Sequence, residues 1–131
     1  RISWNIIHQI NFLIMELSRD SKLLRIFIGS TDHLKHQPLY EAIVFAAKKH
    51  SLAGATVIKG IMSYGASTLV HTAKLIDISV DMPIVVEVVD LEARISDFVG
   101  IVSDMMEEAN CGGLITLEKA EVLYYKSMRK K

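Results

Sequence analysis

Residues 82–90 read MPIVVEVVD, which is the strongest strand signal in the chain. β-Branched residues dominate this run, as is typical of a buried strand. Residues 91–106 then place apolar side chains at three- and four-residue spacing and predict a long amphipathic helix with Asp90 as its N-cap. Asn110, Gly112 and Gly113 end this helix, and a last strand is predicted directly after them, over residues 114–124. This half of the chain is therefore predicted to be strand, helix and strand.

The preceding half predicts the same order of elements. Residues 22–28, KLLRIFI, are a dense apolar run that predicts a buried strand. A polar loop over residues 30–37 follows, and Pro38 fits the first turn of a helix whose apolar stripe begins at Leu39. Residues 55–62 predict the next strand. Two such units in one small domain predict an α+β ferredoxin-like sandwich, β-α-β-β-α-β, with a four-stranded antiparallel sheet and two helices on one face.

The other face of this sheet is predicted to be apolar as well. Alternation along the strands points four apolar side chains away from the helices, namely Leu23, Phe27, Val85 and Val89. We expect self-association to cover this face, in a sheet-packed oligomer. Arg25 lies within the same apolar strand and needs a partner if it is buried. Glu87 on the facing strand is one possible partner, so we favour a structural pair for Arg25.

Length and composition limit the alternatives. The 131 residues are enough for one domain with a sizeable core, which we assign to residues 23–126, followed by a basic tail at 127–131. The 15 basic and 15 acidic side chains balance, so the chain lacks the basic surface of a nucleic-acid-binding protein, and no nucleic acid is expected as partner. Cys111 is the only cysteine, which excludes an intrachain disulfide and makes a reducing, cytoplasmic location the default.

Residues 1–22 differ in pattern from the rest and are interpreted as an N-terminal extension. Polar residues interrupt their apolar ones, so no run approaches the roughly 18 apolar residues that a membrane span needs. An added amphipathic helix and a membrane-surface helix are two readings. The third, which we favour, is a translated leader upstream of a true start at Met15.

Residues 55–74, ATVIKGIMSYGASTLVHTAK, have the composition of a loop that holds an anion. A strand leads into glycines, hydroxyl residues, two lysines and a histidine, and glycine lets backbone amides approach a ligand closely. The candidate ligand-binding residues of this segment are Lys59, Gly60, Tyr64, Gly65, Ser67, His71 and Lys74.

Several separate stretches resemble one family. KLLRIFIG (22–29), PLYEAIVFAAKKHSLAGATVIKGIMSYGA (38–66), HTAK (71–74) and MPIVVEVVD (82–90) resemble, in order, the family numbered 190 among the domains of unknown function. That family is similar to the PII signalling proteins, which are trimers of ferredoxin-like subunits that bind adenine nucleotides between subunits. The resemblance implies nucleotide-binding roles for Lys59 and Gly60 at the base of a mobile loop, and for Gly112 and Gly113 in a phosphate loop.

The chain also departs from the PII pattern. The lysine of the PII phosphate loop has no counterpart in GGLIT (112–116), and LYYK (123–126) lacks the arginine pair that holds the outer phosphates. These departures disfavour a triphosphate and favour a less charged ligand such as a nucleoside monophosphate.

Each candidate has a plainer structural interpretation. Lys59 would be a strand lysine on a solvated edge, and Gly112–Gly113 would be a helix C-cap, which is compatible with a phosphate loop. Tyr64 would pack on a neighbouring subunit instead of stacking on a base, and His71 with Lys74 would be surface residues of a short helix.

Three functions are compatible with these observations. The first is a cytoplasmic PII-like signal-transduction module that binds AMP, ADP or ATP and modulates a partner such as a membrane transporter or channel. The PII resemblance implies that this module is a trimer. The second is a small oligomeric enzyme acting on a phosphorylated metabolite, with His71 as its acid–base group. The third is a metal-binding stress protein using His33 and His36 near Asp32, although a solvated loop explains those residues better. No catalytic motif is present, so we expect a binding protein that is not an enzyme.

Overall fold

The computed structural model describes residues 20–65, the backbone of 71–72, and residues 81–128. The strands and helices of these ranges are β1 (Ser21–Gly29), β2 (His33–Leu34), β3 (Gln37–Pro38), α2 (Leu39–Lys49), β4 (Thr56–Lys59), β5 (Met62–Ser63), β6 (His71–Thr72), β7 (Pro83–Leu91), α3 (Glu92–Ala109) and β8 (Leu114–Ala120).

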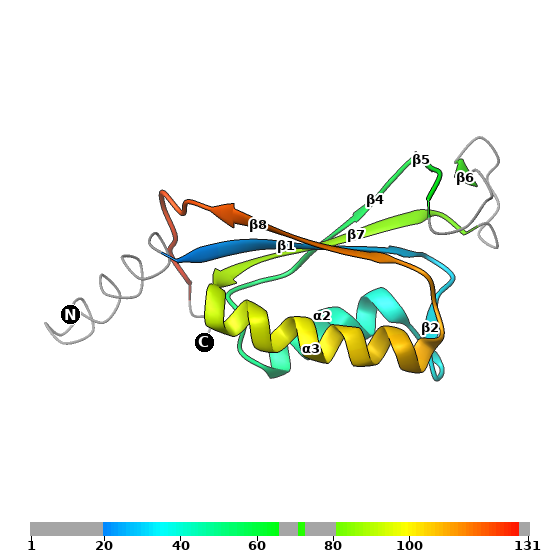
Figure 1. Ribbon diagram of the computed structural model, residues 1–131, viewed down its shortest axis with the longest axis horizontal. Coiled ribbons are helices and arrows are strands. Elements are labelled where there is room, and N and C mark those ends of the chain that lie inside the picture. Colours follow the sequence, from blue (N-terminus) through cyan, green and yellow to red (C-terminus); the bar gives the residue numbers. More distant parts are fainter. Residues whose placement is uncertain (1–19, 66–70, 73–80, 129–131) are drawn as a thin grey trace, which may run out of the picture.

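The main sheet has four strands in the order β4-β7-β1-β8, and every neighbouring pair is antiparallel. β1 and β7 pair along their whole length, from Ser21 opposite Leu91 to Gly29 opposite Pro83. Helices α2 and α3 lie side by side across one face of the sheet, and no other described helix or strand covers the opposite face (Figure 1). The predicted α+β ferredoxin-like sandwich is therefore confirmed.

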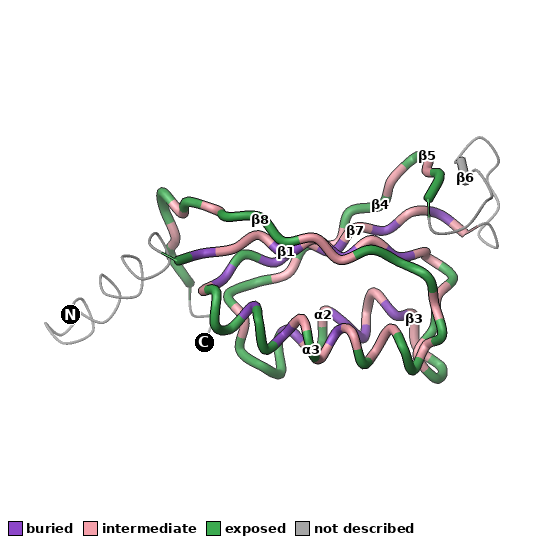
Figure 2. Tube along the Cα trace, in the orientation of Figure 1, coloured by how far each residue is buried: buried purple, intermediate pink, exposed green. Residues whose placement is uncertain are grey.

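The core lies between the sheet and the two helices, as the distribution of buried residues in Figure 2 shows. Strand alternation sends every second side chain of β1 and β7 towards the helices. The buried sheet residues are Leu24, Ile26, Ile28, Ile84, Val86 and Val88. The helices meet them with Leu39, Ile43, Ala47, Ile95, Phe98 and Val102. Each helix thus buries a single stripe, which explains the three- and four-residue spacing in its sequence.

The uncovered face of the sheet, which we call the open face, carries the alternate side chains of the same strands. Leu23, Phe27 and Val85 are half-buried there, and Val89 is exposed. Two further apolar side chains of this face are exposed on the edge strands, Ile58 of β4 opposite Val85 and Leu114 of β8 opposite Phe27.

An ion-pair cluster lies on the open face among these apolar residues. Arg25 Nε donates to Glu87 Oε2 at 2.8 Å, which confirms the predicted pair, and Arg25 Nη1 also donates to Glu118 of β8. The bond to Glu87 is the main factor that raises the pKa of the Arg25 guanidinium. The cluster therefore joins three adjacent strands of the sheet through their side chains.

The predicted N-cap of α3 is wrong, and its predicted end is confirmed at Asn110 but not at the two glycines. Asp90 belongs to β7, and Leu91 occupies the N-cap position without a side-chain cap bond. The buried Asp90 carboxylate instead accepts bonds from the backbone N–H groups of Ala53 at 2.8 Å and Leu91 at 2.7 Å. The helix ends at Asn110, whose φ of 51° supplies the left-handed C-cap that was expected from Gly112–Gly113.

Three element boundaries also differ from the prediction. The segment predicted as a polar loop contains the short β2–β3 hairpin, in which His33 lies opposite Pro38. Pro38 ends that hairpin and occupies the N-cap position of α2. The second strand ends at Lys59 and the last at Ala120, because backbone pairing with the sheet stops at those residues. In the part of the chain that the structure describes, no helix combines the length and the apolar character needed to cross a bilayer.

Candidate functional site

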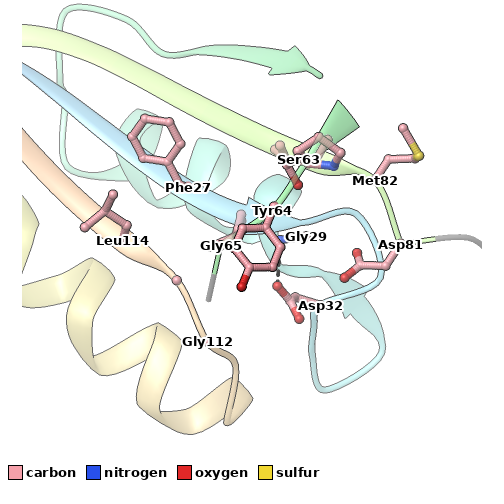
Figure 3. Close-up of a pocket in the computed structure, with 14 residues that line it drawn as sticks. Phe27, Gly29, Asp32, Ser63, Tyr64, Gly65, Asp81, Met82, Gly112 and Leu114 are labelled. Atoms are coloured by element: carbon pink, nitrogen blue, oxygen red, sulfur yellow. Dashed lines mark hydrogen bonds between the residues drawn. The ribbon is translucent and has the colours of Figure 1, made fainter. Parts of the chain in front are cut away.

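A pocket of about 330 Å³ lies at the end of the sheet where β1 and β4 finish and β7 and β8 begin. Four segments that are far apart in sequence form its walls, because the antiparallel order brings these strand ends together. They are the end of β1 with Asp32, the Ser63–Gly65 segment after β4, the start of β7 from Asp81, and the Gly112–Leu114 turn before β8. Figure 3 shows Phe27 and Leu114 on one side of the pocket and Asp32 and Asp81 on the other, with the Tyr64 ring between them beside Asp32.

Hydrogen bonds hold the polar wall of this pocket in place. The Ser30 N–H donates to the Met82 carbonyl at 2.8 Å, and the Met82 N–H donates to Ser30 Oγ at 2.9 Å. The Thr31 N–H donates to Asp81 Oδ1 at 3.1 Å. These three bonds fasten the turn after β1 to the residues that precede β7, although the two segments are about 50 positions apart.

Two glycines of the pocket allow close approach of other groups. A Cβ on Gly113 would lie 2.5 Å from Met106 Cε and 2.7 Å from the Phe27 carbonyl oxygen, so this residue lets β8 begin directly against β1 and α3. A Cβ on Gly29 would overlap the carboxylate of Asp81. Neither glycine has a positive φ, so close packing and not a left-handed backbone explains why a side chain does not fit there.

The described lining of the pocket is acidic. It contains the carboxylates of Asp32 and Asp81, and it includes no lysine, arginine or histidine among the residues that the structure describes. Burial is the main factor that raises the pKa of Asp32, and the nearby charge of Asp81 raises it further. The hydrogen bond that the Gly29 N–H donates to Asp32 Oδ2, at 2.7 Å, acts in the opposite direction. An anionic ligand would therefore meet negative charge on this side of the pocket.

The structure brings some of the predicted site residues together. Tyr64, Gly65, Gly112 and Gly113 line the pocket. Gly60 lies just outside it, where its N–H donates to the carbonyl of the lining residue Pro83 at 2.8 Å.

Other predicted residues lie elsewhere. Lys59 is exposed at the end of the edge strand β4, opposite Ile84, and does not line the pocket. His71 lies in β6 opposite Ser63, so the short helix expected there is wrong at this position. Ser67 and Lys74 lie outside the described residues.

The sequence interpretation missed two pocket residues with chemical character. Asp81 precedes the strongest strand, and nothing in the sequence except its charge indicates a role in the pocket. Its contacts are with the turn after β1, which is distant in sequence. Asp32 was considered as a metal ligand instead. Within the described ranges, no group of three histidine, cysteine or carboxylate side chains is placed to hold a metal ion. His33 Nδ1 lies 2.6 Å from the Thr31 carbonyl oxygen.

Cys111 adjoins the glycine turn and is partly buried. Burial raises the pKa of its thiol, and the negative charge of Asp32 raises that pKa further. The residue therefore lacks the electropositive surroundings that activate a thiolate.

Comparison with known proteins identifies the family. The DUF190 family profile, described as Uncharacterized ACR, matches residues 21–122. A UPF0166 protein of Aquifex aeolicus (strain VF5) is 36% identical over 103 residues, which are 79% of this chain and 93% of that protein. A UPF0166 protein of Methanocaldococcus jannaschii is 28% identical over 102 residues, which are 78% of this chain and 91% of that protein.

Among solved structures, the chain resembles CPII, a nitrogen regulatory PII-like protein from Thiomonas intermedia K12, whose structure was determined with ADP, AMP and bicarbonate bound. The TM-score is 0.57 at 14% identity, over 75% of this chain and 83% of CPII. At that identity the similarity establishes the fold, which is PII-like and ferredoxin-like. The sequence match and the fold agree with the resemblance noted in the sequence, and this chain belongs to the DUF190 family.

Proposed function

We propose that this protein is a PII-like regulatory module that binds an adenine nucleotide, preferably a monophosphate, in the pocket at the end of the sheet. The observation that carries the proposal is the composition of that pocket. The backbone of Gly112 and Gly113 lies on one side, with the aromatic side chains of Phe27 and Tyr64 nearby. Glycine backbone suits a phosphate group, and an aromatic ring suits a base. CPII, which shares the fold, was solved with ADP and AMP bound.

The proposal includes assembly through the open face, with a trimer as the expected form. Phe27 and Leu114 belong both to the open face and to the pocket lining. A second subunit on the open face would therefore lie beside the pocket and contribute to ligand binding. The exposed apolar residues of this face support such an assembly, because burying them removes apolar surface from water.

The proposed mechanism is a shift in population between two states of the segment at residues 63–71. A ligand that contacts Tyr64 and Gly65 would favour the state that offers those contacts, by as much as its affinities for the two states differ. The favoured state would then alter docking to a partner protein in the cytoplasm, for which a membrane transporter or channel is our candidate. No catalytic step is assigned to the chain.

A thermal-shift panel with AMP, ADP, ATP and cyclic nucleotides tests ligand binding. A ligand at about one hundred times its Kd should stabilise the protein by about 2.7 kcal/mol. Tyr64→Ala should abolish the shift, whereas Tyr124→Ala should keep it. The two tyrosines are similarly exposed, at 72% and 77%, but Tyr124 follows the far end of β8. Lys59→Ala tests the predicted role of the lysine. A flat response to every nucleotide would contradict the proposal.

Light scattering after size-exclusion chromatography tests the assembly. Ile58→Asp places a charge on the open face, where this side chain is 45% exposed, and should shift the protein towards monomers. Phe45→Asp is the matched control, because Phe45 is 57% exposed but lies on helix α2. Equal masses for Ile58→Asp and the unmodified chain would argue against assembly through the open face.

A further inference from the structure

We propose that Asp32 and Asp81 set the charge selectivity of the pocket, so that it accepts an adenine ligand with at most one phosphate and rejects the di- and triphosphates. This inference rests on the proposed function and names the determinant of its ligand class. Residues 112–116 lack the lysine of the PII phosphate loop, and residues 123–126 lack the PII arginine pair. These differences explain only a weaker attraction of a polyphosphate. The two carboxylates add an active element of rejection.

Hydrogen bonding supports this role. Backbone N–H groups at a turn are the usual donors to a bound phosphate. The lining carboxylates are themselves bound to donors of this kind, Asp32 to the N–H of the lining residue Gly29 and Asp81 to the N–H of Thr31 in the adjoining turn. A phosphate on this side would have to displace a carboxylate to reach them. The polar wall thus carries carboxylates, whereas a second or third phosphate there would need positively charged groups.

Contacts with two neighbouring residues place the Asp81 side chain in the polar wall. Its carboxylate lies against Gly29, where any Cβ would overlap it, and the side chain also holds the turn after β1 through Thr31. In Figure 3 both carboxylates lie near the end of β1, and the Tyr64 ring lies next to Asp32. A base stacked on Tyr64 would therefore leave its phosphate chain two routes, towards Gly112–Gly113 or towards the aspartates. The first route leads to uncharged glycine backbone, and extension along the second meets like charge.

Calorimetric titration of the full chain with adenosine, AMP, ADP and ATP tests the inference, with EDTA and again with Mg²⁺. The unmodified protein should bind AMP at least about tenfold more tightly than ATP, since each added charge lies within reach of two carboxylates. Asp81→Asn retains an oxygen that can accept from Thr31 N–H but removes the charge, so it should reduce the AMP-to-ATP ratio by about tenfold. Its affinity for uncharged adenosine should stay within about twofold.

Asp32→Asn is the second variant and should change the ratio in the same direction. Asp97→Asn is the matched control, because it removes one negative charge from the exposed side of α3 and should leave the ratio unchanged. Binding of AMP with an unaltered ratio in both pocket variants would overturn this inference and leave the proposed function standing. A preference of the unmodified chain for ATP, with or without Mg²⁺, would also overturn it. Absence of binding by every adenine compound would instead refute the proposed function, and the inference would fall with it.

Discussion

Replacing Gly113 by alanine tests the close packing between the pocket turn and the sheet. The added Cβ would lie 2.5 Å from Met106 Cε, which can move because methionine is flexible. It would also lie 2.7 Å from the Phe27 carbonyl oxygen, which cannot move independently because Phe27 is a backbone partner of Leu114. Overpacking of this kind costs about 1–3 kcal/mol, so we expect a loss of about 2 kcal/mol in the free energy of unfolding.

Urea denaturation at a fixed protein concentration measures this loss, which corresponds to a decrease in Tm of about 8 °C for a domain of this size. Gly100→Ala is the matched control. Gly100 lies within α3, and a Cβ there would meet no atom within 4 Å. The control should be more stable by about 0.5–1 kcal/mol, because alanine loses less backbone entropy in a helix. If Gly113→Ala is as stable as the unmodified protein, the packing argument is refuted.

Three further predictions concern buried and partly buried side chains. Asp90→Ala should lower the free energy of unfolding by about 2–3 kcal/mol in urea denaturation, because it leaves the N–H groups of Ala53 and Leu91 without their acceptor. Asp32→Asn should stabilise the protein at pH 7, since the pKa of Asp32 is raised in the folded state and its charged form is therefore disfavoured there. In the unmodified protein, protonated Asp32 gives its full contribution to stability below the ordinary pKa of 3.8. That contribution is lost as the pH rises through the pKa of Asp32 in the folded state. The advantage of Asp32→Asn in Tm should therefore shrink on acidification. Cys111 should react with iodoacetamide at pH 8 more slowly in the folded protein than in urea, because burial raises the pKa of its thiol, and an equal rate would contradict this.

The layered architecture was predictable because short-range patterns determine it. The alternation in β1 and β7 separates the helix-facing residues from the open face, and it holds at nearly every position of both strands. The same alternation predicted the Arg25–Glu87 pair, since both residues are polar interruptions of apolar strands that face each other in the sheet. Patterns of this range identify which side of an element is buried and require no knowledge of distant contacts.

The helix caps were not predictable from residue type alone. Asp90 is a favourable N-cap residue, but its carboxylate accepts a hydrogen bond from the N–H of Ala53, which is 37 positions away. Asn110 tolerates the left-handed conformation well enough to end α3 before the glycines are reached. Gly112 and Gly113 therefore do not cap the helix. At Gly113 the absence of a side chain allows close packing against β1.

The candidate site was predictable only in part, for the same reason. Tyr64 and Gly65 were candidates because of residue type, and Gly112 and Gly113 were candidates because of the family resemblance. The role of Asp81 depends on Gly29 and Thr31, which lie about 50 positions earlier, and such a contact exists only once β1 and β7 have paired in register. A slip of one strand by one residue would turn that strand's core side chains to the open face, so burial of Ile26 and Val86 fixes the register. The hydrophobic core thus determines where the carboxylate of Asp81 lies, and through it the charge on the polar wall of the pocket.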